Sequence, residues 1–260
     1  MPHAIRLFLV VLAAFLAGAV NSVAGGGTLL SFPALVGLGV PPIIANATST
    51  VALWPASVGS LWGYRAELAG TRRWALRFAV PSAAGGALGA WLLLVTPPRV
   101  FDGVVPVLVL GATMLFVMQR PLQRFTGRPA AEGVDRSTEL PAFTLPLAAW
   151  QLGVGVYGGY FGAGIGILML AALGLMGFTN IHRMNGLKNW GGLCINAVAA
   201  GIFAFSRLVS WPVALAMAAG SAAGGYFGAG LAQRVGQRPV RAGVVVIGFA
   251  SAVWLFLARP

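Results

Sequence analysis

Long apolar segments follow one another along nearly the whole sequence, and they constrain the fold more than any other feature. A membrane core about 30 Å thick needs roughly 20 apolar residues to be crossed as a helix. Eight segments approach that length, with expected ends at Ala4–Ser22, Asn46–Tyr64, Trp74–Val95, Phe101–Met118, Phe143–Tyr160, Met184–Phe205, Trp211–Leu231 and Arg241–Leu257. Two shorter segments, Thr28–Leu38 and Ile165–Met176, each follow a glycine cluster. We expect these two to be half-helices that continue a broken first or fifth helix, or that re-enter the membrane.

The low content of charged residues assigns the chain to the membrane proteins. Hydrophobic residues make up 58% of its 260 residues and charged residues only 8%, with a mean hydropathy of +0.85. A soluble domain carries about 25% charged residues, so this chain lacks the polar surface that water requires. We therefore predict an all-α polytopic membrane protein, in which residues 1–260 form a single integral membrane domain.

The formal net charge of +12 comes from arginines between the apolar segments, together with Lys188, the one lysine. No basic stripe carries interleaved aromatic residues, so we expect contacts with membrane lipid and none with nucleic acid. The one cysteine, Cys194, excludes an internal disulfide and a cysteine-based metal cluster. The N-terminal run resembles a signal peptide, but because many spans follow it we expect an uncleaved first helix.

A polar connection, residues 119–140, separates two apolar halves of the sequence. It holds four arginines and three of the five acidic residues. We expect a solvated linker between repeat one, residues 4–118, and repeat two, residues 143–257. If all eight expected spans cross, eleven arginines fall on the side of the N-terminus and six basic residues on the other. Because positive charge favours the cytoplasm, this count predicts that the linker and both termini are cytoplasmic.

The two halves resemble each other at a constant spacing. The matched pairs are AGGGTLL from Ala24 with AGIGILM from Ala163, Asn46 with Asn185, and SAAGGALGA from Ser82 with SAAGGYFGA from Ser221. The offsets 163−24, 185−46 and 221−82 are each 139 residues. We interpret this as an internal duplication, which is common in transporters, where the binding site lies between the repeats. Four full spans per half predict parallel repeats; if the short segments also cross, the repeats become inverted.

Each half contains a glycine cluster just before its short apolar segment. The clusters are Gly25, Gly26 and Gly27 in one half, and Gly162, Gly164 and Gly166 in the other. Glycine interrupts a helix at low cost, and the freed backbone N–H groups must face protein or a water-lined cavity. A helix that begins after the break, at Thr28 or Ile165, points its positive dipole end into it. We expect an anion seat there; the alternative is that these glycines serve only close helix packing.

A second candidate site is a stripe of polar residues on one face of the sixth expected span. Its members recur at helical spacing and are Asn185, Lys188, Asn189, Gly192 and Asn196. The matching stripe on the second span is Asn46, Ser49, Thr50, Leu53 and Ser57. These side chains could simply bond across helices, and a lysine at this depth could extend to the membrane interface. However, no acid within Met184–Phe205 can pair with Lys188, so we expect it to face a cavity that takes an anion.

The remaining ionisable residues give no support for catalysis. The five acids, Glu67, Asp102, Glu132, Asp135 and Glu139, all fall in expected loops or at span ends. His3 and His182 are terminal or in a loop, and no nucleophile–base–acid set lies in the membrane. We therefore expect no enzyme, no catalytic residues, no cofactor and no metal site.

Two longer segments carry a family resemblance. They are NSVAGGGTLLSFPALVGLGVPPIIANATSTVALWPASVGS, residues 21–60, and GGYFGAGIGILMLAALGLMGFTNIHRMNGLKNWGGLCINAVAA, residues 158–200. In order, spacing and duplication they resemble the sulfite exporter TauE/SafE family of membrane permeases, over nearly the whole chain. One departure is Ile165, which stands where the first cluster has Gly26. The resemblance implies a multi-pass protein of the bacterial inner membrane that moves sulfite, sulfonates or related organic sulfur anions.

These observations together predict a secondary carrier or facilitator for a small anion. The expected substrate-binding residues are Gly25, Gly26, Gly27, Thr28, Asn46, Ser49, Thr50, Gly162, Gly164, Gly166, Asn185, Lys188 and Asn189. Without a buried carboxylate, we expect coupling to be absent or to be carried by protonation of the substrate. A carrier of a neutral or cationic solute and a non-transporting scaffold or accessory subunit remain as alternatives, and homo-oligomerisation is left open.

Overall fold

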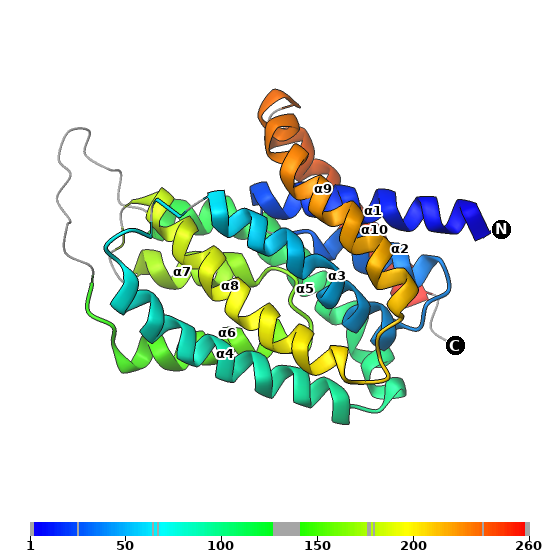
Figure 1. The fold of residues 1–260 in the computed structure, drawn as a ribbon, viewed down its shortest axis with the longest axis horizontal. Coiled ribbons are helices and arrows are strands. Elements are labelled where there is room, and N and C mark those ends of the chain that lie inside the picture. Colours follow the sequence, from blue (N-terminus) through cyan, green and yellow to red (C-terminus); the bar gives the residue numbers. More distant parts are fainter. Residues whose placement is uncertain are drawn as a thin grey trace.

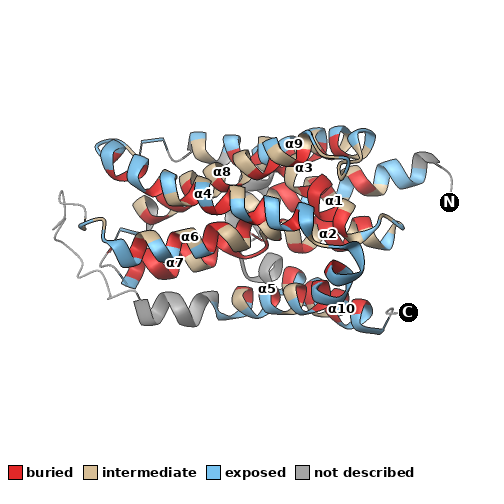
Figure 2. Cartoon of the chain, turned by 90° about the horizontal axis from the view of Figure 1, so that it is seen from below, coloured by how far each residue is buried: buried red, intermediate tan, exposed pale blue. Residues whose placement is uncertain are grey.

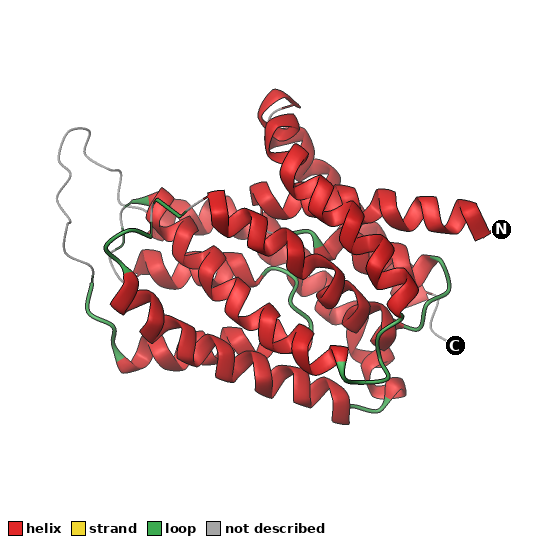
Figure 3. Ribbon diagram, in the orientation of Figure 1, coloured by secondary structure: helices red, strands yellow, loops and turns green. Residues whose placement is uncertain are grey.

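The computed structural model describes residues 3–24, 26–63, 65–66, 68–126, 141–175, 178, 180–235 and 237–257. These residues form ten helices and no strand (Figure 3). The helices are α1 (His3–Ala24), α2 (Thr28–Gly37), α3 (Pro42–Gly63), α4 (Arg72–Val95), α5 (Pro98–Thr126), α6 (Leu145–Tyr160), α7 (Ile165–Leu175), α8 (Ile181–Ala204), α9 (Trp211–Val235) and α10 (Gln237–Leu257). The prediction of an all-helical protein is therefore confirmed.

Each expected apolar segment coincides with a helix, and the differences lie at the ends. α3 begins at Pro42 instead of Asn46, and α5 begins at Pro98. Proline suits the first turn of a helix because the N–H that it lacks has no partner there. α5 continues to Thr126, which corrects the expected start of the linker at residue 119. The rest of that linker, residues 127–140, lies outside the described part of the chain.

Small residues bring two pairs of helices into direct backbone contact: α1 packs on α9, and α4 packs on α6. A Cβ atom on Gly224 would meet the backbone carbonyl of Phe15, and one on Gly85 would meet that of Leu152. Both glycines belong to the repeated SAAGG sequences. The close approach that small residues allow is the usual way in which membrane helices associate, and here each contact joins one half of the sequence to the other.

The central helices α3 and α8 lie against each other, with α9 beside α3 and α4 beside α8 (Figure 1). Ser221 on α9 donates a hydrogen bond to the carbonyl oxygen of Ala52 on α3 (2.7 Å). The indole N–H of Trp190 on α8 donates to the carbonyl of Ala75 on α4 (2.9 Å). These bonds fix α3 and α8 from both sides.

The two short helices begin where the chain turns back on the helix before them. A Cβ on Gly27 would meet the carbonyl of Ala17 and would lie 3.1 Å from the Cβ of Asn21, both on α1. Likewise, a Cβ on Gly158 of α6 would lie 3.2 Å from the Cγ2 atom of Ile165, the first residue of α7. Both turns therefore place the start of a short helix inside the bundle.

The chain's two ends lie at one end of the molecule, and residues 141–144, which lead into α6, lie at the other (Figure 1). At this second end the indole N–H of Trp74 donates to the carbonyl of Pro141 (2.9 Å). At the first end the backbone N–H of Ser210 donates to the hydroxyl of Thr48 (3.1 Å). α3 and α9 therefore start at the end where the termini lie, and α4 and α6 start opposite.

Many of the residues that are exposed on the outside of the bundle (Figure 2) are large and hydrophobic. Large exposed side chains include Phe8, Val80, Trp91, Leu215 and Val246, each more than half exposed. By length and hydropathy, two helical stretches of the described chain are able to cross a membrane, Arg72–Val95 and Pro98–Met118. The central helices α3 and α8 fall short of that hydropathy because both carry several polar residues.

The contact between α4 and α6 gives a direct test of the packing. A Cβ on Gly155 would lie 2.9 Å from the Cα of Gly85 and 3.0 Å from the Ser82 carbonyl, whereas one on Gly153 of the same helix meets nothing within 4 Å. We expect Gly155→Leu to cost more than the about 1–3 kcal/mol of ordinary overpacking, since backbone cannot yield as side chains do. Thermal unfolding of the purified protein measures this. Gly153→Leu is the matched control, and equal unfolding temperatures for the two variants would contradict the packing.

Candidate functional site

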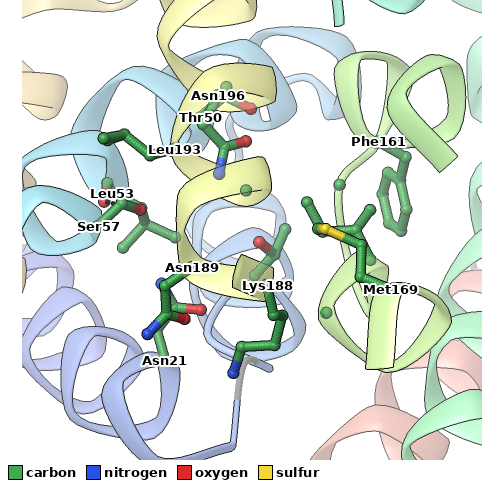
Figure 4. A pocket seen from close by; sticks show the side chains of 15 residues that line it. Asn21, Thr50, Leu53, Ser57, Phe161, Met169, Lys188, Asn189, Leu193 and Asn196 are labelled. Atoms are coloured by element: carbon green, nitrogen blue, oxygen red, sulfur yellow. Dashed lines mark hydrogen bonds between the residues drawn. The ribbon is translucent and has the colours of Figure 1, made fainter. Parts of the chain in front are cut away.

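A polar cavity lies between α3 and α8, at the two turns that precede the short helices (Figure 4). Its volume is about 70 Å³, enough for several water molecules or one small ion. Its walls come from both halves of the sequence, and the lining residues are Asn21, Thr28, Thr50, Leu53, Ser57, Phe161, Gly162, Ile165, Gly166, Met169, Lys188, Asn189, Gly192, Leu193 and Asn196. The cavity therefore lies at the centre of the bundle, where the halves meet.

Lys188 extends along one side of this cavity, with Asn21 and Asn189 on one flank and Met169 on the other (Figure 4). Only 9% of the residue is exposed. Its aliphatic stem packs on the start of α7, where a Cβ on Gly166 would lie 3.1 Å from the Lys188 Cδ atom. Within the described part of the chain, no acidic side chain forms an ion pair with its ammonium group. The lysine therefore brings an unpaired cation into the interior.

The polar side chains around Lys188 also have unused hydrogen-bonding capacity. Among the described residues, Asn21, Thr28, Asn189 and Asn196 have no side-chain hydrogen-bond partner. Thr50 and Ser57 instead donate to carbonyl oxygens of their own helix, those of Asn46 (3.0 Å) and Leu53 (3.4 Å). Because polar groups in protein interiors are nearly always satisfied, this cavity is built for water or for a polar ligand.

The starts of α2 and α7 both reach the cavity, through Thr28 and Ile165. Gly27 precedes α2 and has no side chain to cap it. The first N–H groups of a helix have no partner within the helix, and they carry the positive end of its dipole. Both helix starts therefore add positive potential to that of Lys188.

The glycines of the turn before α7 and of its first residues are needed for two different reasons, backbone conformation and close packing. Gly162 and Gly164 adopt φ angles of +84° and +81°, a backbone conformation that residues with a side chain rarely take. The Tyr157 hydroxyl holds this turn by donating to the carbonyl of Ala163 (2.7 Å). Gly166 makes room for the lysine stem. The turn before α7 thus depends on glycine both for its shape and for the position of Lys188.

The first glycine cluster contributes to packing instead of to the cavity wall. A Cβ on Gly26 would lie 2.7 Å from the ring of Phe116 on α5, and Gly27 packs on α1. Gly25 lies outside the described residues. For Gly26 and Gly27, the contacts favour the alternative reading of close helix packing.

Six of the expected binding residues line the cavity: Thr28, Thr50, Gly162, Gly166, Lys188 and Asn189. Six other described ones do not: Gly26, Gly27, Asn46, Ser49, Gly164 and Asn185. Asn46 is 1% exposed, and its amide N–H₂ donates to the carbonyl of Tyr160, the last residue of α6 (2.8 Å). This bond secures the end of α6 at the turn, so Asn46 supports the site without lining it.

The sequence did not single out several residues that line the cavity. Asn21, Phe161, Met169 and Leu193 come from the chain around the turns and from α8. Asn21 could have been found, because it and Ser22 are the last polar residues of an apolar helix before a glycine cluster. Leu53, Ser57, Gly192 and Asn196 belong to the two polar stripes but were not named as binding residues. Across the described residues, no group of three or more His, Cys, Asp or Glu side chains could hold a metal ion.

An all-helical chain with an apolar exterior and an uncompensated polar cavity at its centre has the architecture of a membrane transporter. The sequence pattern of the family described as Sulfite exporter TauE/SafE matches residues 10–255. The chain therefore belongs to this family, and the expected resemblance is confirmed.

Three relatives agree with this assignment. "Probable membrane transporter protein ORF9" of Sinorhizobium sp. is 30% identical over 95% of this chain and 91% of its own length. A "Probable membrane transporter protein" of Haemophilus influenzae is 29% identical over 90% and 88%. "Probable membrane transporter protein YfcA" of Escherichia coli K12 is 28% identical over 90% and 83%. All three names describe membrane transporters. No solved structure matches.

Cysteine labelling tests whether the cavity is wet and positive. In a Cys194→Ser background, we expect Ser57→Cys, which faces the cavity, to react with a small anionic thiosulfonate faster than with a cationic one. Ser82→Cys is the matched control, because Ser82 is buried between Phe78 and Gln151 and is bonded to both. Reaction rates measure both properties. Equal rates at the two positions, or a preference for the cationic reagent, would contradict the assigned cavity.

Proposed function

We propose that this protein is a secondary carrier or facilitator that moves a small anion through the central cavity. The observation that carries the proposal is the buried Lys188 ammonium, which faces hydrogen-bonding side chains and has no acidic partner among the described residues. Asp102 is the one acid that the structure describes, and it is exposed at the start of α5. An ionisable group in such a place normally pairs with another charge or marks a substrate path.

Three features of the cavity favour an anion over a neutral or cationic solute. Lys188 supplies a formal charge, and its stem is held in place by Gly166. The starts of α2 and α7 supply backbone N–H groups. Amide groups of Asn21, Asn189 and Asn196 can donate further hydrogen bonds. A cation would meet repulsion from the first two features, and a neutral solute would leave the charge unpaired.

The family name supports sulfite, a sulfonate or a related organic sulfur anion as the substrate. A volume of about 70 Å³ limits the enclosed part of the substrate to a few non-hydrogen atoms. On the side away from Asn189, Phe161, Ile165 and Met169 present apolar surface. The walls would therefore suit a compact anion with a small apolar face. We place this activity in the bacterial inner membrane.

The helix contacts support the proposed duplication. If α1 to α5 correspond to α6 to α10, the contact of α1 with α9 corresponds to that of α6 with α4, and α3 with α9 to α8 with α4. Three pairs of cavity residues also stand at the offset of 139 residues: Thr50 with Asn189, Leu53 with Gly192, and Ser57 with Asn196. A site that both repeats line in this way lies between them, as in other transporters built from repeats. Lys188 corresponds to Ser49, so the charge is supplied by one half alone.

The directions of the helices support inverted repeats over parallel ones, with α1–α2 and α6–α7 as re-entrant pairs. The arginines then divide differently from the count for eight alternating spans. By the order of the helices along the sequence, the side of the termini would then be assigned four: Arg6, Arg99, Arg207 and Arg259. The opposite side would be assigned twelve: Arg65, Arg72, Arg73, Arg77, Arg120, Arg124, Arg128, Arg136, Arg183, Arg234, Arg238 and Arg241. This stronger bias favours a cytoplasmic linker with both termini outside the cytoplasm, so the sequence-based placement of the termini is replaced.

The orientation can be tested with single cysteines in the Cys194→Ser background. Arg207→Cys lies on the exposed connection between α8 and α9, and Ala69→Cys lies on the exposed connection between α3 and α4, at the opposite end of the bundle (Figure 1). We expect a membrane-impermeant maleimide added to intact cells to label the first and to leave the second unlabelled until the cells are lysed. The reverse pattern would support cytoplasmic termini and overturn the inverted arrangement.

Transport itself can be tested in liposomes. The described residues offer no buried carboxylate for proton or sodium coupling, and an inside-negative potential alone supplies about 2.3 kcal/mol per 100 mV for export of a monoanion. We therefore expect electrogenic sulfite flux without sodium. Because Lys188 supplies the charge, we expect Lys188→Met to reduce flux by at least about tenfold, the effect of about 1.4 kcal/mol, and Lys188→Arg to retain part of it.

Arg207→Gln, which removes an exposed charge that does not line the cavity, is the control for Lys188→Met. Unchanged thermal unfolding of both variants excludes a folding defect. Flux that is insensitive to Lys188→Met would favour a neutral solute, and obligatory sodium dependence would contradict the proposed mechanism. Purified protein that moves no anion would favour the accessory-subunit alternative.

A further inference from the structure

A second basic site lies at the start of α4, separate from the central cavity. A groove of about 480 Å³ is lined there by Gly70, Arg72, Arg73, Trp74, Arg77, Pro141, Ala142 and Phe143. None of these residues lines the central cavity. The groove lies at the end of the bundle opposite the chain termini, next to residues 141–144.

The wall of this groove is held by an aromatic cluster around Trp74, which is 6% exposed. The Trp74 ring stacks on Phe78 with centroids 5.2 Å apart, and it meets Phe143 and Phe178 edge-on at 5.5 Å and 5.1 Å. Its indole N–H donates to the carbonyl of Pro141. These contacts fix the start of α4 against residues 141–143. The groove is therefore formed before any ligand arrives.

Three arginines share this groove, and each of them is exposed. In the part of the chain that the structure describes, Arg72, Arg73 and Arg77 have no ion-pair or hydrogen-bond partner. They stand in the first turns of α4, where the helix dipole disfavours positive charge. The Thr71 hydroxyl donates to the carbonyl of Leu68 and does not cap the helix. Three guanidinium groups beside free backbone N–H groups match the oxygens of a phosphate.

The face of α4 below these arginines is apolar and exposed. Arg73 and Arg77 continue at helical spacing into Val80, Leu88 and Trp91, which are 69%, 50% and 58% exposed. A soluble anion makes no favourable contact with an apolar face, whereas the acyl chains of a lipid can pack along it.

We propose that this groove is a binding site for an anionic phospholipid, with the phosphate of the headgroup held by Arg72, Arg73 and Arg77 and the acyl chains lying along the exposed face of α4. The site is independent of the proposed anion path. The competing explanation is that the arginines pair with Glu67 and Glu139, which are near in sequence and lie outside the described residues. In that case the charge of the lipid would make no difference to the protein.

Lipid titration of the whole protein, purified in a neutral detergent, tests this site. Phosphatidylglycerol and phosphatidylcholine are added separately, and the lipid concentration for half-maximal thermal stabilisation is measured for each. We expect phosphatidylglycerol to act at a concentration about tenfold or more below that of phosphatidylcholine, since each arginine near an anionic headgroup contributes about 1 kcal/mol. The variant Arg73→Gln/Arg77→Gln should lose this preference.

The double variant Arg99→Gln/Arg207→Gln is the matched control and should keep the preference for phosphatidylglycerol. It removes one arginine at the start of α5 and one in the connection between α8 and α9, and both of these segments lie at the end of the bundle opposite the groove (Figure 1). Inorganic phosphate at the same concentrations should not stabilise the wild type. Equal action of the two lipids, equal loss in both double variants, or full stabilisation by inorganic phosphate would each overturn the proposal. Because the measurement involves no transport, its failure would leave the proposed carrier function untouched.

Discussion

The ammonium group of Lys188 is the constraint on which the rest of the structure depends. An unpaired charge in the interior of a membrane protein costs several kcal/mol unless water or a counter-ion compensates it. The aliphatic stem of Lys188 packs on Gly166, and only 9% of the residue is exposed, so its ammonium group is held in the interior and does not extend to the surface. Its surroundings offer amides, a hydroxyl and two helix starts, all of which can donate hydrogen bonds. A bound anion would neutralise the charge of the lysine and accept hydrogen bonds from these donors at the same time.

The backbone contacts between the two halves position this cavity. Gly85 allows α4 to pack closely on α6, and Gly224 allows α9 to pack closely on α1. Each of these contacts joins one half of the chain to the other. α3 and α8 therefore lie at the centre of the bundle, and residues of both polar stripes line a cavity of about 70 Å³ between them. Two turns close the site, and the bonds from Asn46 to Tyr160 and from Tyr157 to Ala163 hold the second of them. The asymmetry between Lys188 and Ser49 gives the site one charged side.

Much of the fold could be predicted from the sequence, because helices in a membrane are defined by apolar length, and every expected segment proved helical. The polar stripes also predicted part of the site. Thr50 on α3, and Lys188 and Asn189 on α8, belong to these stripes and do line the cavity. Contacts between distant residues were not accessible in this way. Gly27 and Gly166 correspond at the offset of 139 residues, yet the first packs on the backbone of α1 and the second on the aliphatic stem of Lys188. Asn46 and Asn185 do not line the cavity, although they belong to the stripes, because helical spacing predicts a shared face but not which residues of that face a distant segment covers; Asn46 is bonded to Tyr160.

The central claim is that an anion binds between Lys188 and the start of α7. The most direct measurement is anomalous diffraction from crystals grown with selenite, whose selenium atom marks the position of a sulfite-like anion. The account predicts one strong anomalous peak inside the cavity, within hydrogen-bonding reach of the Lys188 Nζ and Asn189 side-chain atoms, and its absence in Lys188→Met. An empty cavity in the wild type at saturating selenite, or a peak that persists unchanged in Lys188→Met, would contradict it.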